Sequence, residues 1–154
     1  NITYRNSHGG IMLQGGKGNK VFNNIFVDST MAQGYFPNFQ DNSTGQALER
    51  NIFYYSDPEA LLIAGGNLTP EVLRADHNLY YAPGVATPRI RVRGIASFAQ
   101  WQERGFDRNS VIADPRFLDP AKDDYALRPD SPAFALGFQA IDTRRVGLLT
   151  RRME

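Results

Sequence analysis

The sequence predicts an all-β fold, a parallel β-helix (solenoid) whose last coils end in a C-terminal cap with one short helix. An asparagine before an apolar residue recurs at positions 1, 24, 51 and 78, at spacings of 23, 27 and 27 residues. The segments around these asparagines are short and rich in β-branched and aromatic residues, as strands are. Fixed periods of this length are typical of solenoids, in which each repeat buries its apolar face only by stacking on its neighbours.

Composition limits the class of protein before any residue is considered. The chain has 154 residues, of which 42% are hydrophobic and 21% charged, so one domain with a core is expected rather than disorder. Its 17 basic and 16 acidic residues nearly balance, which points to no polyanion and therefore to no nucleic-acid partner. No cysteine is present to form disulfides or thiolate metal sites. No apolar run approaches the ~20 residues of a membrane span.

The chain divides into two parts of one domain. Residues 1–84 carry the repeated pattern and are expected to form the coils. Residues 85–154 are expected to form a final strand, a short helix and the cap. Because the sequence opens on Asn1 without a leader, we expect upstream coils of the same chain to be missing.

Each repeat contains two short β segments that meet at the asparagine. The bends contain Asn or Asp-His-Asn, residue types that tolerate a left-handed backbone and hydrogen-bond to their own turn. A third strand per repeat is predicted within residues 10–14, 34–36 and 60–63. Stacked coils would place the asparagines of successive repeats one above another, where their side chains bond to each other. Turn residues of a β-sandwich are the alternative, although a sandwich gives no reason for equal spacing.

The turns that vary in length are the ones expected to carry function. The longest runs from Asp28 to Gly45, and a shorter one follows Ile63. Insertions in a solenoid lie on one face, often the binding face. The glycine-rich turn at residues 15–18 is not followed by the helix or the Gly-Lys-Ser/Thr of a phosphate-binding loop.

The last third of the chain reads as strands around one helix. Residues 87–93 alternate apolar residues with arginines, as a half-exposed strand does. Ser97 and Gln100 form a capping-box pattern and Gly105 suits the C-terminal cap, which predicts a helix between them. Trp101 either anchors that helix or stacks on a sugar. Short strands are expected within residues 111–117 and 124–127, with a turn at 131–133, to cover the open end of the solenoid.

These residues resemble a known family. The segment from Ser97 to Asp142 contains Asp-Pro-x-Phe, Asp-Tyr-x-Leu and Ser-Pro-Ala in that order, after repeats that read NNIF, RNIF and HNLYY. It resembles the C-terminal end of bacterial right-handed parallel β-helix repeat proteins, in the pectate-lyase-like superfamily of carbohydrate-active proteins. The resemblance implies a right-handed coil, a secreted protein in an extracellular or periplasmic location, and a polysaccharide or oligosaccharide partner. It does not select the reaction, because relatives include hydrolases, lyases and epimerases.

Glycoside hydrolysis is the favoured activity, and it needs two carboxyl groups about 5 to 9.5 Å apart. Asp28, just after a repeat strand, and Asp41, in the long turn, are the candidate acid and base, while Asp28 is also typical of a turn residue. His8 is a third candidate, as an acid or base or as a hydrogen-bonding group. It precedes a Gly-Gly strand that resembles the one bordering the family's cleft. Many relatives carry an acidic residue after that strand, where this chain has Gln14.

Two alternatives to hydrolysis stay open. A polysaccharide lyase of the same fold would use a basic residue such as Arg50, Lys17 or Lys20, together with Ca²⁺. For a hydrolase or a binding module we expect no cofactor. The sequence contains no dense acidic turn of the kind that would coordinate Ca²⁺. A non-catalytic sugar-binding or scaffold module would use exposed rings, for which Tyr35 and Phe39, beside Phe36, are the candidates unless they pack inside. Gln14 and Arg50 complete the residues expected to bind substrate.

Overall fold

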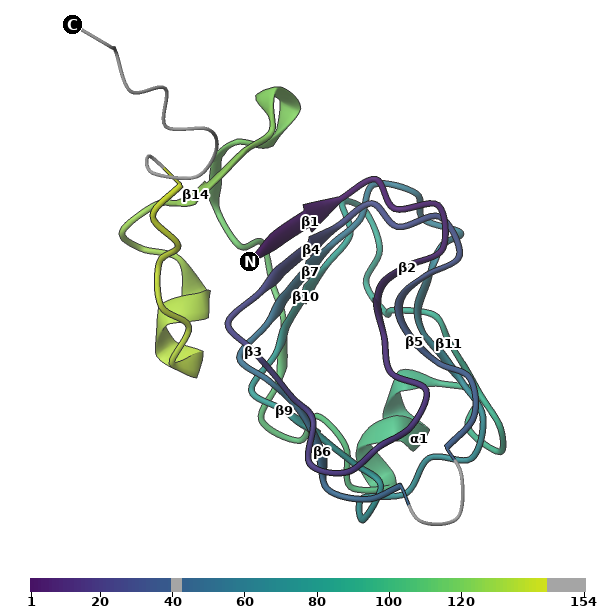
Figure 1. Ribbon diagram of the computed structural model, residues 1–154. Helices are drawn as coiled ribbons and strands as arrows, with labels where there is room; N and C mark the ends of the chain where they lie inside the picture. Colours follow the sequence, from purple (N-terminus) through teal and green to yellow (C-terminus); the bar gives the residue numbers. More distant parts are fainter. Residues whose placement is uncertain (40–42, 144–154) are drawn as a thin grey trace, which may run out of the picture.

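The computed structural model describes residues 1–39 and 43–143, which form about three turns of a parallel β-solenoid (Figure 1). The coil is viewed along its axis in Figure 1, so that equivalent strands lie behind one another. This stacking confirms the parallel β-helix and rules out the β-sandwich. No helix among the described residues is long and apolar enough to cross a membrane.

Three parallel sheets form the walls of the coil. The first sheet contains β1 (Ile2–Tyr4), β4 (Ile25–Val27), β7 (Ile52–Tyr54), β10 (Leu79–Tyr81) and β12 (Val111–Ile112). The second contains β2 (Gly9–Met12), β5 (Ala32–Phe36), β8 (Leu61–Gly65) and β11 (Ile90–Val92). The third contains β3 (Lys20–Phe22), β6 (Gln46–Glu49) and β9 (Leu73–Asp76). Each strand pairs in register with its equivalent one coil away, as Ile25 does with Ile52 and Ile52 with Leu79.

The recurring asparagines form the ladder that their spacing predicts. The side-chain nitrogen of Asn24 donates to Oδ1 of Asn51 at 3.0 Å, and that of Asn51 donates to Oδ1 of Asn78 at 3.2 Å. Asn1 joins the ladder at 2.9 Å from Asn24. The residue before each of the last three rungs has a left-handed backbone, with φ of 57° at Asn23, 54° at Arg50 and 55° at His77. The bend between the third and first sheets therefore repeats in every coil.

The inside of the coil is filled by stacked apolar side chains. The rings of Phe26, Phe53 and Tyr80 succeed one another with centroids 4.9 and 5.3 Å apart, and all three are buried. Neighbouring residues of the same strands point the other way, since side chains alternate along a strand. Buried Ile25 and Leu79 lie on that outer face, in a second apolar cluster.

The short helix α1 (Phe98–Glu103) covers the last coil, and it begins at Ser97, whose side chain accepts from the Gln100 backbone N–H. Trp101 is fully buried, which favours its reading as an anchor over sugar stacking. Its indole N–H donates to Asp107 at 2.7 Å, and Asp107 also accepts from Asn78 at 3.0 Å. Burial raises the pKa of the Asp107 carboxyl, although its hydrogen bonds favour the ionised form. The asparagine ladder thus ends on a buried carboxyl group that also holds the helix.

The described residues after β12 lie along the side of the coil instead of over its end. We call residues 113–141 the outer segment; it contains β13 (Phe117–Asp119), η1 (Pro120–Lys122), β14 (Asp124–Leu127) and η2 (Pro132–Leu136). Phe117, Tyr125, Ala133 and Phe138 of this segment pack on the outer face of the first sheet. The expected strand at 111–117 is divided, because Val111–Ile112 continues the first sheet while Phe117 begins an antiparallel pair with β14.

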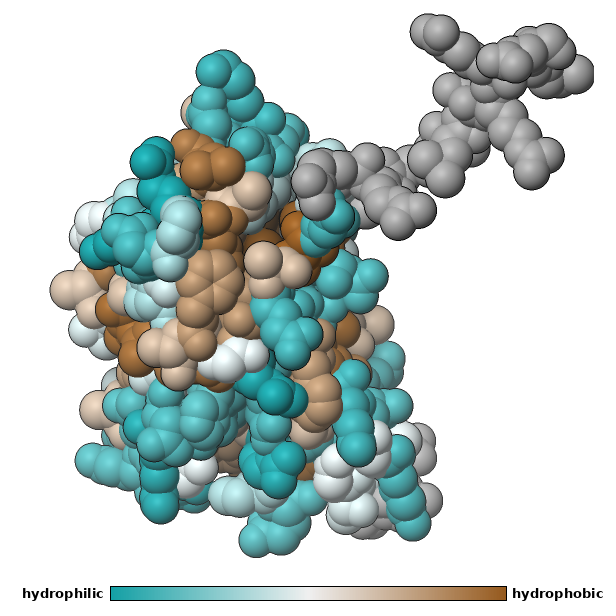
Figure 2. All heavy atoms as spheres, turned by 90° about the vertical axis from the view of Figure 1, so that its left-hand side faces the viewer, coloured by the Kyte–Doolittle hydropathy of each residue, from teal (hydrophilic) through white to brown (hydrophobic). Residues whose placement is uncertain are grey.

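The outer segment returns to the first coil and is tied to it there. Arg5 forms an ion pair with Asp123 at 2.6 Å. The side-chain amide of Asn23 donates to the Gln139 carbonyl oxygen and accepts from the Gln139 backbone N–H. Apolar side chains gather in the middle of the molecular face that carries this segment, between hydrophilic ones at the top and over much of the lower part (Figure 2). The expected cap therefore has two parts: α1 closes the end of the coil, and the outer segment covers the first sheet.

Candidate functional site

A row of side chains crosses the outer face of the second sheet. Strand register aligns Met12 with Tyr35, Tyr35 with Ala64, and Ala64 with Arg91. Met12 is 50% exposed, Tyr35 is half-buried and Arg91 is exposed. We call these four residues the outer row. It runs across the four strands of the second sheet, on a face that the outer segment does not cover.

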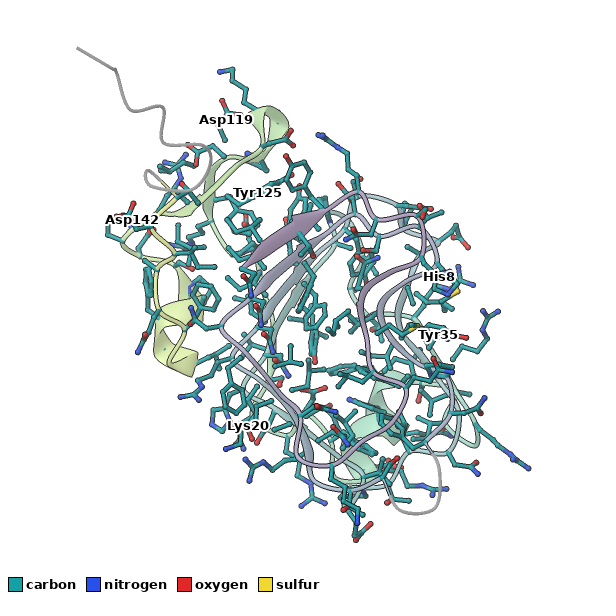
Figure 3. The ribbon with its side chains drawn as sticks, viewed as in Figure 1. His8, Lys20, Tyr35, Asp119, Tyr125 and Asp142 are labelled. Atoms are coloured by element: carbon teal, nitrogen blue, oxygen red, sulfur yellow. The ribbon has the colours of Figure 1, made fainter. Side chains whose placement is uncertain are left out.

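His8 and Tyr35 are the two predicted site residues that the structure brings together. Their ring centroids are 5.1 Å apart, with the rings edge to face. Figure 3 shows both outside β2 and β5, on the side of the coil away from Tyr125. A Cβ at Gly9 would lie 3.2 Å from that of Tyr35, so the glycine leaves space beside the tyrosine.

Two hollows follow the turns that connect the first sheet to the second, and together we call them the turn groove. The larger has a volume of about 630 Å³ and the smaller about 340 Å³; both are lined by Thr30, Asp57 and Ala60. Glu59 and Arg89 face each other in the larger hollow as an exposed ion pair. Arg91 also lines it, so the groove adjoins the outer row. The groove therefore presents carboxylates and guanidinium groups at the Arg91 end of the outer row.

Asp28 lies in the smaller hollow, where it acts as a turn residue. Its backbone is left-handed, with φ of 49°, and its Oδ1 accepts from the Ser56 backbone N–H at 2.6 Å and from the Ser56 hydroxyl at 2.9 Å. These bonds link the turns of neighbouring coils. The other predicted catalytic carboxylate, Asp41, lies outside the described residues.

The aromatic residues of the long turn separate into inside and outside positions. Phe36 is fully buried in the coil, and Phe39 is half-buried against the same core. Tyr35 lies outside, because it alternates with Phe36 along β5. The expected cluster of exposed rings is therefore one tyrosine, with Phe39 contributing to packing.

The other predicted substrate-binding residues lie apart from His8. Gln14 is exposed and follows β2, at the end of the strand away from His8. Arg50 lies at the bend between β6 and β7, with its guanidinium carbon 5.1 Å from the centroid of the Phe22 ring. Lys20, another basic candidate, is on the third sheet and on the opposite side of the coil from His8 (Figure 3). The structure does not bring these residues together into one site.

Apart from Asp28, sequence reasoning missed the charged residues of the turn groove. Asp57 and Glu59 lie in a turn of ordinary length, and Arg89 directly precedes β11, so none stood out. One signal was available, since the alternation in residues 87–93 predicts that Arg91 faces outward. No group of three or more His, Asp or Glu side chains is placed to hold a metal ion within residues 1–39 and 43–143.

Comparison of the chain with protein-family models, with curated proteins and with solved structures finds no match in any of the three. The parallel β-solenoid therefore follows from the strand pairing of this chain, and the function has to be argued from the outer row and the turn groove.

Proposed function

We propose that the outer row and the turn groove bind a polysaccharide, as part of a secreted, carbohydrate-active β-helix protein of the right-handed, pectate-lyase-like type. One observation carries the proposal: Tyr35 stands on an in-register sheet face whose outer row continues through Ala64 to Arg91, and Arg91 lines a groove that carries charges of both signs. An aromatic ring offers an apolar face that suits the C–H face of a sugar. Guanidinium and carboxylate groups bind hydroxyls in defined directions.

The shape of the face supports a chain rather than a compact ligand. The outer row is continuous over the four strands of the second sheet, and strands in neighbouring coils lie about 4.8 Å apart. Buried Ala64 next to Tyr35 keeps the surface low on one side, and Gly9 keeps it low on the other. A saccharide chain lying across the coils would contact one residue of the row after another.

Glycoside hydrolysis is the second candidate, because Asp57 and Glu59 line the same hollow. Glu59 already pairs with Arg89, and Asp57 accepts from the Glu59 backbone N–H at 2.9 Å. Hydrolysis would require one of these carboxyl groups to hold a proton beside the glycosidic oxygen and the other to be ionised. Binding ranks first because it needs no such rearrangement.

The test compares wild type with Tyr35→Ala and with Tyr4→Ala on a panel of neutral and acidic polysaccharides. Tyr4 is a matched control, since it is 47% exposed but lies on the first sheet. We expect Tyr35→Ala to weaken binding at least tenfold in affinity electrophoresis and calorimetry, and Tyr4→Ala to leave it within twofold. Equal losses in both variants, or no binding to any member of the panel, would reject the proposal.

A parallel assay of the same panel separates binding from catalysis. New reducing ends that disappear in Asp57→Asn and Glu59→Gln would establish hydrolysis. Absorbance from unsaturated uronates would indicate a lyase instead, and chelation would then test its need for Ca²⁺. Binding without either product is the result that the proposal expects.

A further inference from the structure

A second hollow lies on another side of the molecule, between the first sheet and the outer segment. Its volume is about 430 Å³, within the range of about 300–1,000 Å³ that small-molecule sites occupy. It shares no lining residue with the turn groove. Its walls come from the ends of β7 and β10 and from residues 114–130, so it exists only because the outer segment folds back on the coil.

Aromatic rings form one wall of this hollow. Tyr54 and Tyr81 are paired in register by β7 and β10, with ring centroids 6.0 Å apart. Phe117 from the outer segment meets Tyr54 edge to face at 5.6 Å. Neither tyrosine hydroxyl has a hydrogen-bond partner among the described residues. Burial, with a smaller contribution from the charge of Asp28, raises the pKa of Tyr54, so its hydroxyl keeps its proton and can donate.

Charged side chains form the rim, and one of them has no carboxylate partner. Arg116 is paired with Asp130. Asp114 accepts only from the Arg116 backbone N–H, at 2.7 Å, within the described part of the chain. The side chain of Arg128 makes a single long hydrogen bond there, 3.4 Å from Nη2 to the Leu118 carbonyl oxygen. Its guanidinium group therefore has most of its five donors available to a ligand.

From these three features we infer that this hollow binds a sugar acid, with the ligand's carboxylate on Arg128 and its ring against Tyr54 and Tyr81. A carboxylate is the group that the planar guanidinium fork binds best, by two parallel hydrogen bonds. The ligand's hydroxyls would meet the two tyrosine hydroxyls and the free oxygen of Asp114. A simple anion would leave the aromatic wall unused, and a neutral sugar would leave Arg128 without its partner. The inference does not depend on polysaccharide binding at the outer row.

The experiment measures binding of glucuronate, glucose and acetate by calorimetry and by ligand-observed NMR. We expect a Kd on the order of 1 mM for glucuronate, as suits a small ligand in an open site, and at least tenfold weaker binding of glucose and acetate. Arg128→Gln should weaken glucuronate binding at least tenfold, and Tyr81→Ala should weaken it to a similar degree. Arg104→Gln, an exposed arginine at the end of α1, should leave it unchanged.

Each other outcome overturns the inference. Equal glucuronate binding by wild type and Arg128→Gln would show that Arg128 does not bind the ligand's carboxylate. Equal binding of acetate and glucuronate would show that the site recognises only an anion. Circular dichroism and thermal unfolding verify that each variant is folded. Tyr35→Ala should retain glucuronate binding, so a failure at the outer row and a failure here can be told apart.

Discussion

Replacing Asn51 with alanine tests the asparagine ladder at its most connected rung. Oδ1 of Asn51 accepts from the backbone N–H and from the side chain of Asn24, both at 3.0 Å. Its side-chain nitrogen lies within hydrogen-bond distance of the Val21 and Glu49 carbonyl oxygens, at 2.9 and 3.0 Å, and of Asn78. Asn51 is 1% exposed, so water cannot take over these bonds without opening the coil.

The magnitude follows from what each lost bond leaves behind. The buried N–H of Asn24 loses its acceptor, which costs about 1–3 kcal/mol, and each donated bond lost removes about 0.5–1.5 kcal/mol more. Since such contributions are not additive between neighbours, we expect Asn51→Ala to lower the free energy of unfolding by about 3–5 kcal/mol. That lies above the range of about 0.5–3 kcal/mol of most substitutions.

Urea unfolding followed by the fluorescence of the single tryptophan measures this change, as a lower midpoint with an unchanged slope. Asn67→Ala is the matched control, because Asn67 is exposed, and it should change stability by less than about 0.5 kcal/mol. The double variant Asn24→Ala/Asn51→Ala should show coupling of at least about 0.5 kcal/mol. A loss below about 1 kcal/mol in Asn51→Ala, or full additivity, would refute the ladder as a source of stability.

Three further predictions follow from buried or crowded positions. Burial raises the pKa of Asp107, so ionising this carboxyl group costs more in the folded than in the unfolded chain. Its contribution to stability is therefore greatest below the pKa of the unfolded chain and declines as the pH rises through the pKa of the folded chain. Asp107→Asn should therefore flatten the pH dependence of the unfolding free energy, and an unchanged slope would contradict this. A Cβ at Gly66 would lie 2.3 Å from the Pro37 carbonyl oxygen, so Gly66→Ala should cost about 1–3 kcal/mol and lower Tm; an unchanged Tm would show that the turn adapts freely. Phe117→Ala should cost about 3–5 kcal/mol and expose residues 113–141 to protease before the coil, whereas Arg5→Ala, which breaks an exposed ion pair, should cost less than about 1 kcal/mol. Simultaneous cleavage of coil and outer segment in the Phe117 variant would argue against their separate packing.

The local pattern of this chain was sufficient to predict the coil. Asn24, Asn51 and Asn78 bond to one another because equal spacing places equal residues at the same point of successive coils. Each bend has one residue with a left-handed backbone. In two bends this residue is Asn23 or His77, residue types that tolerate the left-handed conformation, and in the bend between them it is Arg50. The helix also begins at Ser97 as its capping pattern predicts. All of these depend on residues near in sequence or one period apart.

The sites depended on contacts that no local pattern encodes. Periodicity distinguishes the two faces of a strand, but Tyr35 and Phe36 are both aromatic, and only the packed coil decides that Phe36 is the buried one. The hollow beside Tyr54 and Arg128 needs the outer segment to return to the first coil, where Arg5 meets Asp123, a residue 118 positions away. Sequence determines the strands, bends and ladder because their interactions repeat with a fixed period. Tertiary structure decides which surfaces are open, because that depends on the single, non-repeating way in which the outer segment covers the first sheet.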